Sequence, residues 1–142
     1  MKIAFGSDDV TELTRGIEAF LRERGDDIVL FGALREGGTD AWTAMAQDVG
    51  EAVAGGIARF GIVCCWTGTG ASIAANKVRG VRAALCGDAQ TARGAREWND
   101  ANVLALSLRA TSVAVAREIL DAWFAGSPTV EPRYRAMIEE LE

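Results

Sequence analysis

Short apolar runs alternate with helically spaced apolar positions along the whole chain. Runs such as 1–7 and 60–65 are apolar and end in small or polar residues, as buried parallel strands do. Between the runs, apolar side chains recur every three or four residues, as at Leu13, Ile17 and Leu21. The predicted strands are 1–7, 27–31, 60–65, 80–86 and 102–106, and the predicted helices are 11–24, 42–54, 71–77, 89–97 and 112–124.

This alternation of strand and helix with short loops predicts a parallel sheet that is covered on both faces. The fold class is α/β, a Rossmann-like three-layer α/β/α sandwich with a five-stranded parallel sheet. We expect residues 1–142 to form a single domain. Pro128 and Pro132 mark an extended tail that ends in one helical turn over 135–141, and the tail, 126–142, is expected to pack on a partner subunit.

Charge and hydropathy narrow the class of partner. The net charge of −5 and the pI of about 4.8 argue against a nucleic-acid partner. No apolar run approaches the ~20 residues that span a bilayer, and the first residues lack a signal-peptide pattern. We therefore expect a cytoplasmic protein with a small-molecule ligand and no membrane partner.

The cysteine and histidine content limits the chemistry. The chain has three cysteines and no histidine. An odd number of cysteines in apolar surroundings favours reduced thiols over a disulfide framework. The lack of histidine excludes Ser-His-Asp and Cys-His machinery, and three cysteines alone are a poor zinc ligand set. No metal site is expected.

In a doubly wound sheet, ligands bind at the carboxyl ends of the strands. In this sequence those ends carry acids, a thiol, hydroxyl groups and arginine, in the segments 6–9, 64–72, 87–88 and 107–109. The glycine-rich segment 64–72 is neither a dinucleotide fingerprint, since the third glycine is missing, nor a Walker loop. On its own it fits a tight turn as well as a ligand loop.

Cys64 and Cys65 alternate across the pleat, so only one of them can point toward the ligand edge. Cys65 ends its strand beside loop amides that would stabilise a thiolate, and it is the candidate general base. Cys64 and Cys86 are expected to be small buried core residues.

Several motifs together resemble the type B ribose-5-phosphate isomerases, the family that also holds the galactose-6-phosphate isomerase subunits. The segment 65–77, Cys-Trp-Thr-Gly-Thr-Gly-Ala-Ser-Ile-Ala-Ala-Asn-Lys, is similar to the family's signature loop. Segments 6–8, 81–86, 92–93 and 96–104 are similar to further family motifs, so the resemblance covers nearly the whole chain.

The resemblance implies an aldose–ketose isomerase that needs neither a metal nor an organic cofactor. Cys65 would take a proton from the carbon next to the carbonyl and give an enediolate. Amides between Gly68 and Ser72 would hold the oxyanion, Thr67 would move hydroxyl protons, and Asp8 would bind sugar hydroxyls. The family site lies between two subunits, so a homodimer or homotetramer is expected, with the 96–100 segment and C-terminal arginines supplied by the partner.

This chain departs from the family pattern at positions around the substrate. Asp9 and Trp98 stand where the family has histidine, and Trp66 stands where it has glycine. The family's Asp-Tyr-Pro segment is here Asp40-Ala41-Trp42, without the tyrosine. Arg133 matches one phosphate-binding arginine, whereas the second falls at Met137. The residues expected to contact substrate are Asp9, Trp66, Gly68, Gly70, Ser72, Trp98, Asn99, Arg109 and Arg133.

The residues that match the family, among them Cys65 and Thr67, belong to the deprotonation step. The family residues that are replaced here are those that open the sugar ring and bind the phosphate. We therefore expect isomerisation of a sugar other than ribose 5-phosphate, one that is open-chain or readily opened, such as an unphosphorylated sugar or a sugar acid. Two alternatives stay open. One is ribose-5-phosphate isomerase activity with rearranged helper residues, and the other is a non-catalytic sugar-binding subunit of a heteromer. The indoles of Trp66 and Trp98 fit sugar stacking or packing at a dimer interface.

Overall fold

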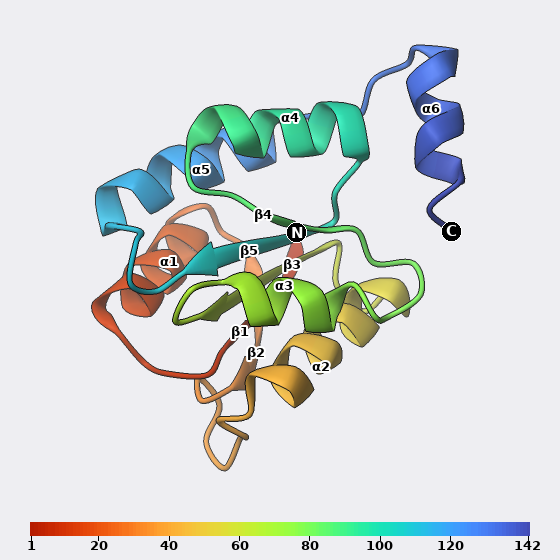
Figure 1. Ribbon diagram of the computed structural model, residues 1–142. Helices are drawn as coiled ribbons and strands as arrows, with labels where there is room; N and C mark the ends of the chain where they lie inside the picture. Colours follow the sequence, from red (N-terminus) through yellow and green to blue (C-terminus); the bar gives the residue numbers. More distant parts are fainter.

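Five parallel strands form one sheet between two layers of helices in the computed structural model, which describes residues 1–142 (Figure 1). The strands are β1 (Lys2–Ser7), β2 (Asp27–Gly32), β3 (Phe60–Cys65), β4 (Ala83–Leu85) and β5 (Val103–Ser107), in the spatial order β2-β1-β3-β5-β4. The helices are α1 (Glu12–Glu23), α2 (Trp42–Ala54), α3 (Thr69–Ala75), α4 (Ala89–Asn99), α5 (Val113–Ala125) and α6 (Pro132–Glu139). The α/β fold class is confirmed.

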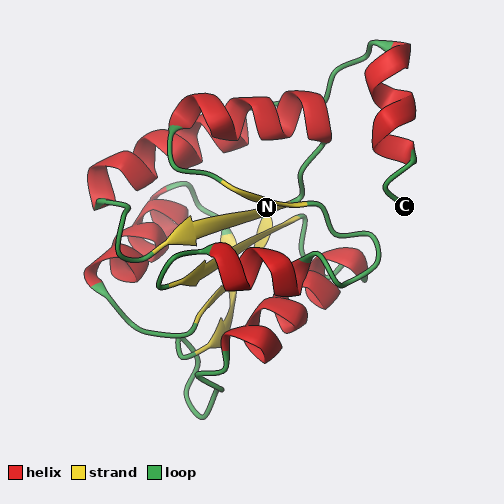
Figure 2. Cartoon of the chain, in the orientation of Figure 1, coloured by secondary structure: helices red, strands yellow, loops and turns green.

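Each face of the sheet has its own apolar core, because side chains alternate along the strands. Ile3, Phe5 and Ile62 point to the face that α1, α4 and α5 cover. Ala4 and Val63 point to the opposite face, covered by α2 and α3. Figure 2 shows these helices on both sides of the strands. No helix combines the length and the apolar character needed to cross a membrane.

The predicted bounds of several elements shift by a residue or more, and at three of them the difference has a clear physical reason. Helix α3 begins at Thr69 rather than 71, because Gly68 takes a left-handed φ of 77° and ends the loop early. Strand β4 is Ala83–Leu85 rather than 80–86, because the segment before it is held by the Asn102 side chain, which accepts from the Arg82 N–H and donates to the Gly80 carbonyl. Helix α6 has eight residues from Pro132 rather than a single turn, and proline is well suited to its first position.

Helix α6 stands apart from the sandwich beyond the end of α4 (Figure 1). None of its residues is buried. Its contact with α4 includes the rings of Trp98 and Tyr134, whose centroids are 4.8 Å apart. A helix with so little cover of its own is consistent with packing on a partner subunit, which stays a prediction.

Arg96 fixes the end of α4 to the core. Its side chain is buried, and its guanidinium lies 4.7 Å from the ring centroid of Phe60 and 5.6 Å from that of Trp123. The Nη1 group donates to the Asp100 carboxylate at 3.0 Å and to the Ala101 carbonyl at 2.7 Å. A buried charge with these partners positions the turn that follows α4.

Gly32→Ala should lower the free energy of unfolding more than Gly25→Ala does. Both glycines have positive φ, 66° and 80°, but a Cβ at position 32 would lie 2.3 Å from the Ser7 carbonyl oxygen, whereas one at position 25 meets nothing within 4 Å. We expect about 1 kcal/mol of destabilisation for Gly25→Ala, from φ alone, and about 3 kcal/mol or more for Gly32→Ala. Urea unfolding measures both, and equal losses would refute the clash.

Candidate active site

The carboxyl ends of β1, β3 and β5 bring the candidate catalytic residues to one edge of the sheet. In the parallel ladders Ser7 pairs with Cys64, and Cys65 pairs with Ser107. The Asp8 N–H donates to the Cys64 carbonyl at 3.3 Å, so Asp8 lies beside Cys65. This edge is called the catalytic rim below.

The two adjacent thiols face opposite sides of the sheet. Cys65 is 5% exposed and packs on the side of α2 and α3, where its Sγ accepts a hydrogen bond from the Ala71 N–H at 3.5 Å. Cys64 is fully buried among residues of the opposite core, and burial raises the pKa of its thiol strongly. The geometry therefore favours Cys65 as the reactive thiol.

The loop between β3 and α3 presents free backbone donors. The N–H groups of Gly68, Thr69 and Gly70 make no hydrogen bond within the chain. Gly68 is required here, because its φ is 77° and a Cβ would lie 2.6 Å from the Leu85 side chain. The hydroxyls of Thr67 and Thr69 are 2.8 Å apart and share a hydrogen bond. Amides left unpaired in this way can donate hydrogen bonds to a developing oxyanion.

Ser72 departs from its expected role. Its N–H donates to the Gly68 carbonyl at 3.1 Å, inside the first turn of α3. The amide at position 72 is therefore already used, and the free donors lie two to four positions earlier, at Gly68–Gly70. The extent of the free amides depends on where the helix begins, which the sequence pattern set two residues too late.

Three carboxylates gather on the β1 side of the catalytic rim. The Ser7 hydroxyl donates to the Asp9 carbonyl at 2.7 Å and holds the turn that carries Asp8 and Asp9. Partial burial raises the pKa of Asp8, and the neighbouring charges of Asp9 and Asp40 raise it further. Asp40 belongs to the loop before α2, so this loop comes close to the rim.

Trp42 is a rim residue that sequence reasoning did not select. It opens α2 and is 43% exposed. A Cβ at position 70 would lie 3.0 Å from Cε3 of the indole, so the ring packs directly on Gly70. In the sequence, only the replacement of the family's Asp-Tyr-Pro segment by Asp40-Ala41-Trp42 drew attention to this position. That replacement did not show which residue the indole contacts.

Trp66 and Arg109 also lie on the catalytic rim, in the loops after β3 and β5. The Arg109 N–H donates to the Trp66 carbonyl at 3.1 Å, and the Ser107 hydroxyl donates to the same carbonyl at 2.9 Å. The Trp66 indole is 63% exposed. These bonds fix the Trp66 backbone and leave its ring free.

Trp98, Asn99 and Arg133 lie at the other edge of the sheet. Helix α4 starts after the carboxyl end of β4 and runs back to the amino end of β5, which carries Trp98 and Asn99 away from Cys65 (Figure 1). Arg133 is on α6, beyond that end. One chain thus brings together the thiol and the loop, but not these three predicted substrate contacts.

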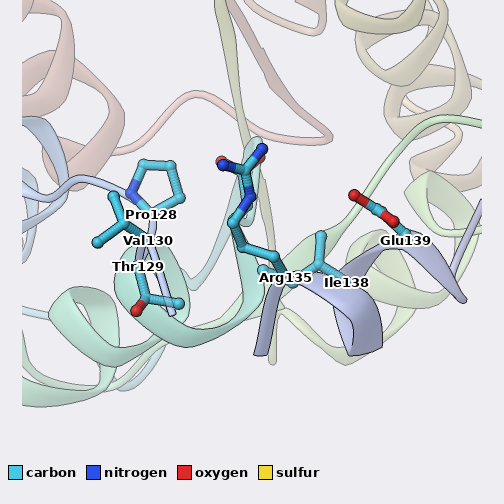
Figure 3. Close-up of a pocket in the computed structure, with 7 residues that line it drawn as sticks. Pro128, Thr129, Val130, Arg135, Ile138 and Glu139 are labelled. Carbon is cyan, nitrogen blue, oxygen red and sulfur yellow. The ribbon is translucent and has the colours of Figure 1, made fainter. Parts of the chain in front are cut away.

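A groove at this far edge contains Arg135, the arginine nearest in sequence to the missing second one. The groove lies between α6 and the segment 128–130, and the Arg135 side chain extends between them (Figure 3). Asp100 also lines it. Arg135 therefore sits far from Cys65 of its own chain.

No group of three or more histidine, cysteine, aspartate or glutamate side chains is placed to hold a metal ion. The rim offers a thiol, carboxylates, hydroxyls and backbone amides, which suit proton transfer on a polar organic substrate.

Comparison with known proteins agrees with this chemistry. A family described as Ribose/Galactose Isomerase matches residues 3–141. The chain is 40% identical to "Ribose-5-phosphate isomerase B" of Escherichia coli over 99% of this chain and 93% of that protein. It is 35% identical to "D-erythrulose-4-phosphate isomerase" of Pectobacterium atrosepticum, over 87% and 82%. The structure of Clostridium thermocellum ribose-5-phosphate isomerase B superposes with a TM-score of 0.90 at 39% identity, covering 99% of this chain and 95% of that one.

The fold and the rim define an isomerase that moves protons on a sugar. The chain belongs to the Ribose/Galactose Isomerase family. As a member of this family of sugar-phosphate isomerases it is an aldose–ketose isomerase, an intramolecular oxidoreductase.

Iodoacetamide should modify Cys65 before Cys64 and Cys86. Burial and the charge of Asp88 raise the pKa of Cys86 to about 11, so only about one thiol in a thousand is ionised at pH 8. Cys64 has no exposed surface. Peptide mass spectrometry of the native protein over time measures the order. Earlier modification of Cys64 or Cys86 would contradict the assignment of the reactive thiol.

Asp8→Asn should raise the melting temperature at pH 7 by about 2 °C. Because the folded-state pKa of Asp8 is raised, the folded protein binds the proton more tightly than the unfolded chain, and stability falls as pH rises from about 4 through the folded-state value. The gain from the variant should therefore vanish near pH 3, where Asp8 is protonated in both states. A gain that persists at pH 3 would show another cause.

Proposed function

We propose that this chain isomerises a sugar other than ribose 5-phosphate through an enediolate, with Cys65 as the base. The observation that carries the proposal is the placement of the Cys65 Sγ beside the Ala71 N–H and a loop of unpaired amides. A thiolate next to backbone donors supplies both a proton acceptor and a site for negative charge on the substrate.

The reaction moves one proton between two carbons and one between two oxygens, and it needs no external oxidant. The Cys65 thiolate takes the proton from the carbon next to the carbonyl, and the electron pair of that C–H bond forms the enediolate double bond. The former carbonyl oxygen becomes an oxyanion, held by the amides of Gly68, Thr69 and Gly70. A hydroxyl of the Thr67–Thr69 pair moves the proton between the two oxygens, and Cys65 returns its proton to the neighbouring carbon.

The substrate preference rests on groups that the chain lacks. With no histidine in the sequence, no imidazole can assist ring opening, a role typically worth ~10²–10⁴-fold in rate. Trp98 stands at the place of that histidine and packs on Tyr134. Asp9 adds a negative charge to the rim. These features favour a substrate that is open-chain or opens readily.

The relatives show that this fold serves more than one sugar. Relatives at 40% and 35% identity are named for ribose 5-phosphate and for D-erythrulose 4-phosphate, and a third is named as galactose-6-phosphate isomerase subunit LacB, of Clostridium acetobutylicum. We infer that a second copy of the chain brings Asn99 and Arg133 to the rim, since each chain carries them at its far edge. The active unit would then be a homodimer or a larger assembly.

Isomerisation in heavy water tests the proposal. The enzyme would be incubated with a panel of phosphorylated and unphosphorylated aldoses, ketoses and sugar acids, including ribose 5-phosphate, and followed by proton NMR. We expect deuterium at the carbon next to the carbonyl of one sugar class, and a loss of about a thousandfold in Cys65→Ala.

Cys64→Ala is the matched control, because it removes the adjacent thiol on the opposite face and should keep its activity. Unchanged deuterium exchange in Cys65→Ala would rule out Cys65 as the base. Fastest exchange with ribose 5-phosphate would refute the substrate preference. No exchange with any sugar would favour a subunit that needs a second homologous chain.

A further inference from the structure

Trp42 closes the catalytic rim on the side of α2. Its indole packs on Gly70, with a distance of 3.0 Å from Cε3 to the position of a Cβ at residue 70. The next residue, Ala71, donates its N–H to the Cys65 Sγ. The ring therefore lies one residue from the group that touches the candidate base.

The loop before Trp42 also lies close to the rim at its β1 end. Asp40 is close enough to Asp8 for its charge to act on that carboxyl. The segment 40–42 thus spans the rim from Asp8 to the first turn of α3. Within this span Trp42 is 43% exposed, although a tryptophan that served only as core would be covered.

We propose that Trp42 is a specificity-determining residue that stacks on the carbon chain of the substrate and selects an uncharged, polyhydroxylated segment there. This inference rests on the proposed isomerase function of the same rim. The indole offers an apolar face to the C–H groups of a sugar, and the neighbouring carboxylates accept hydrogen bonds from its hydroxyls.

The charge of the surroundings decides the ligand chemistry. Asp40 stands two residues before Trp42, the charges of Asp9 and Asp40 both act on the Asp8 carboxyl, and like charges repel at short range. A phosphate or carboxylate group placed against the indole would meet these carboxylates. A phosphate on the substrate would have to lie at the end of the sugar away from Trp42.

Alditols of four to six carbons are suitable probes, because they mimic open-chain sugars and cannot react. Binding to the unaltered chain would be followed by tryptophan fluorescence and calorimetry, and because an alditol has no carbonyl group the result does not depend on the identity of the base. We expect at least one alditol to bind, about tenfold weaker binding in Trp42→Ala, and recovery to within twofold in Trp42→Phe. Inorganic phosphate should not compete with the alditol.

Ile57→Ala is the matched control, since Ile57 is a large apolar residue that is 60% exposed and follows α2 at the end opposite to Trp42. It should bind alditols as the parent does. Equal alditol affinity in Trp42→Ala, binding of no alditol, or displacement by phosphate would each overturn the proposal. A change in oligomeric mass in Trp42→Ala without a change in affinity would make the indole a subunit contact instead. Failure of the Cys65 proposal would appear separately, as persistent exchange in Cys65→Ala.

Discussion

A strand that is buried on both faces must send consecutive side chains to opposite cores, and the site of this protein depends on that constraint at β3. All six residues of β3 are buried. The alternation sends Cys64 into one core and Cys65 toward α3, where the Ala71 N–H donates a hydrogen bond to its Sγ. A shift of one residue in the register of β3 would exchange the two thiols and turn Cys65 away from the rim. The pairing with β1 and β5 therefore fixes which thiol faces the rim as well as the order of the sheet.

The rest of the rim is built largely from the backbone. Gly68 turns the chain with a left-handed conformation, and the amides after it are left without partners. The Ser7 and Ser107 hydroxyls tie down the turns after β1 and β5. This arrangement leaves unpaired amides on a loop that is held by its neighbours, and donors fixed in advance are the kind that stabilise an oxyanion well. The side chains at Asp9, Trp42 and Trp66 are where the sequence departs from the motifs that it resembles.

Much of the fold was readable from local pattern, because alternating runs and helical spacing each encode one buried face. Helix α2 and strand β3 have the predicted bounds, and Cys65 was selected from its place at the end of a strand. The contact of Trp42 with Gly70 was not readable, since it depends on a missing Cβ and on a loop that folds back across the rim. The role of Arg96 was equally hidden, because a buried guanidinium between Phe60 and Trp123 has no periodic signal. Likewise, the start of α6 was not readable from apolar spacing, because the helix begins at Pro132 and buries none of its residues.

The packing of an indole on Gly70 also links two positions that are far apart in the sequence. A Cβ at position 70 would lie 3.0 Å from Cε3 of the ring, so the ring would have to shift by a few tenths of an ångström to admit it. Residues in contact rarely contribute independently to stability, so the cost of a side chain at position 70 depends on which residue stands at position 42. The two positions are therefore epistatic, and a glycine that is tolerant of substitution beside a small residue becomes selective beside tryptophan.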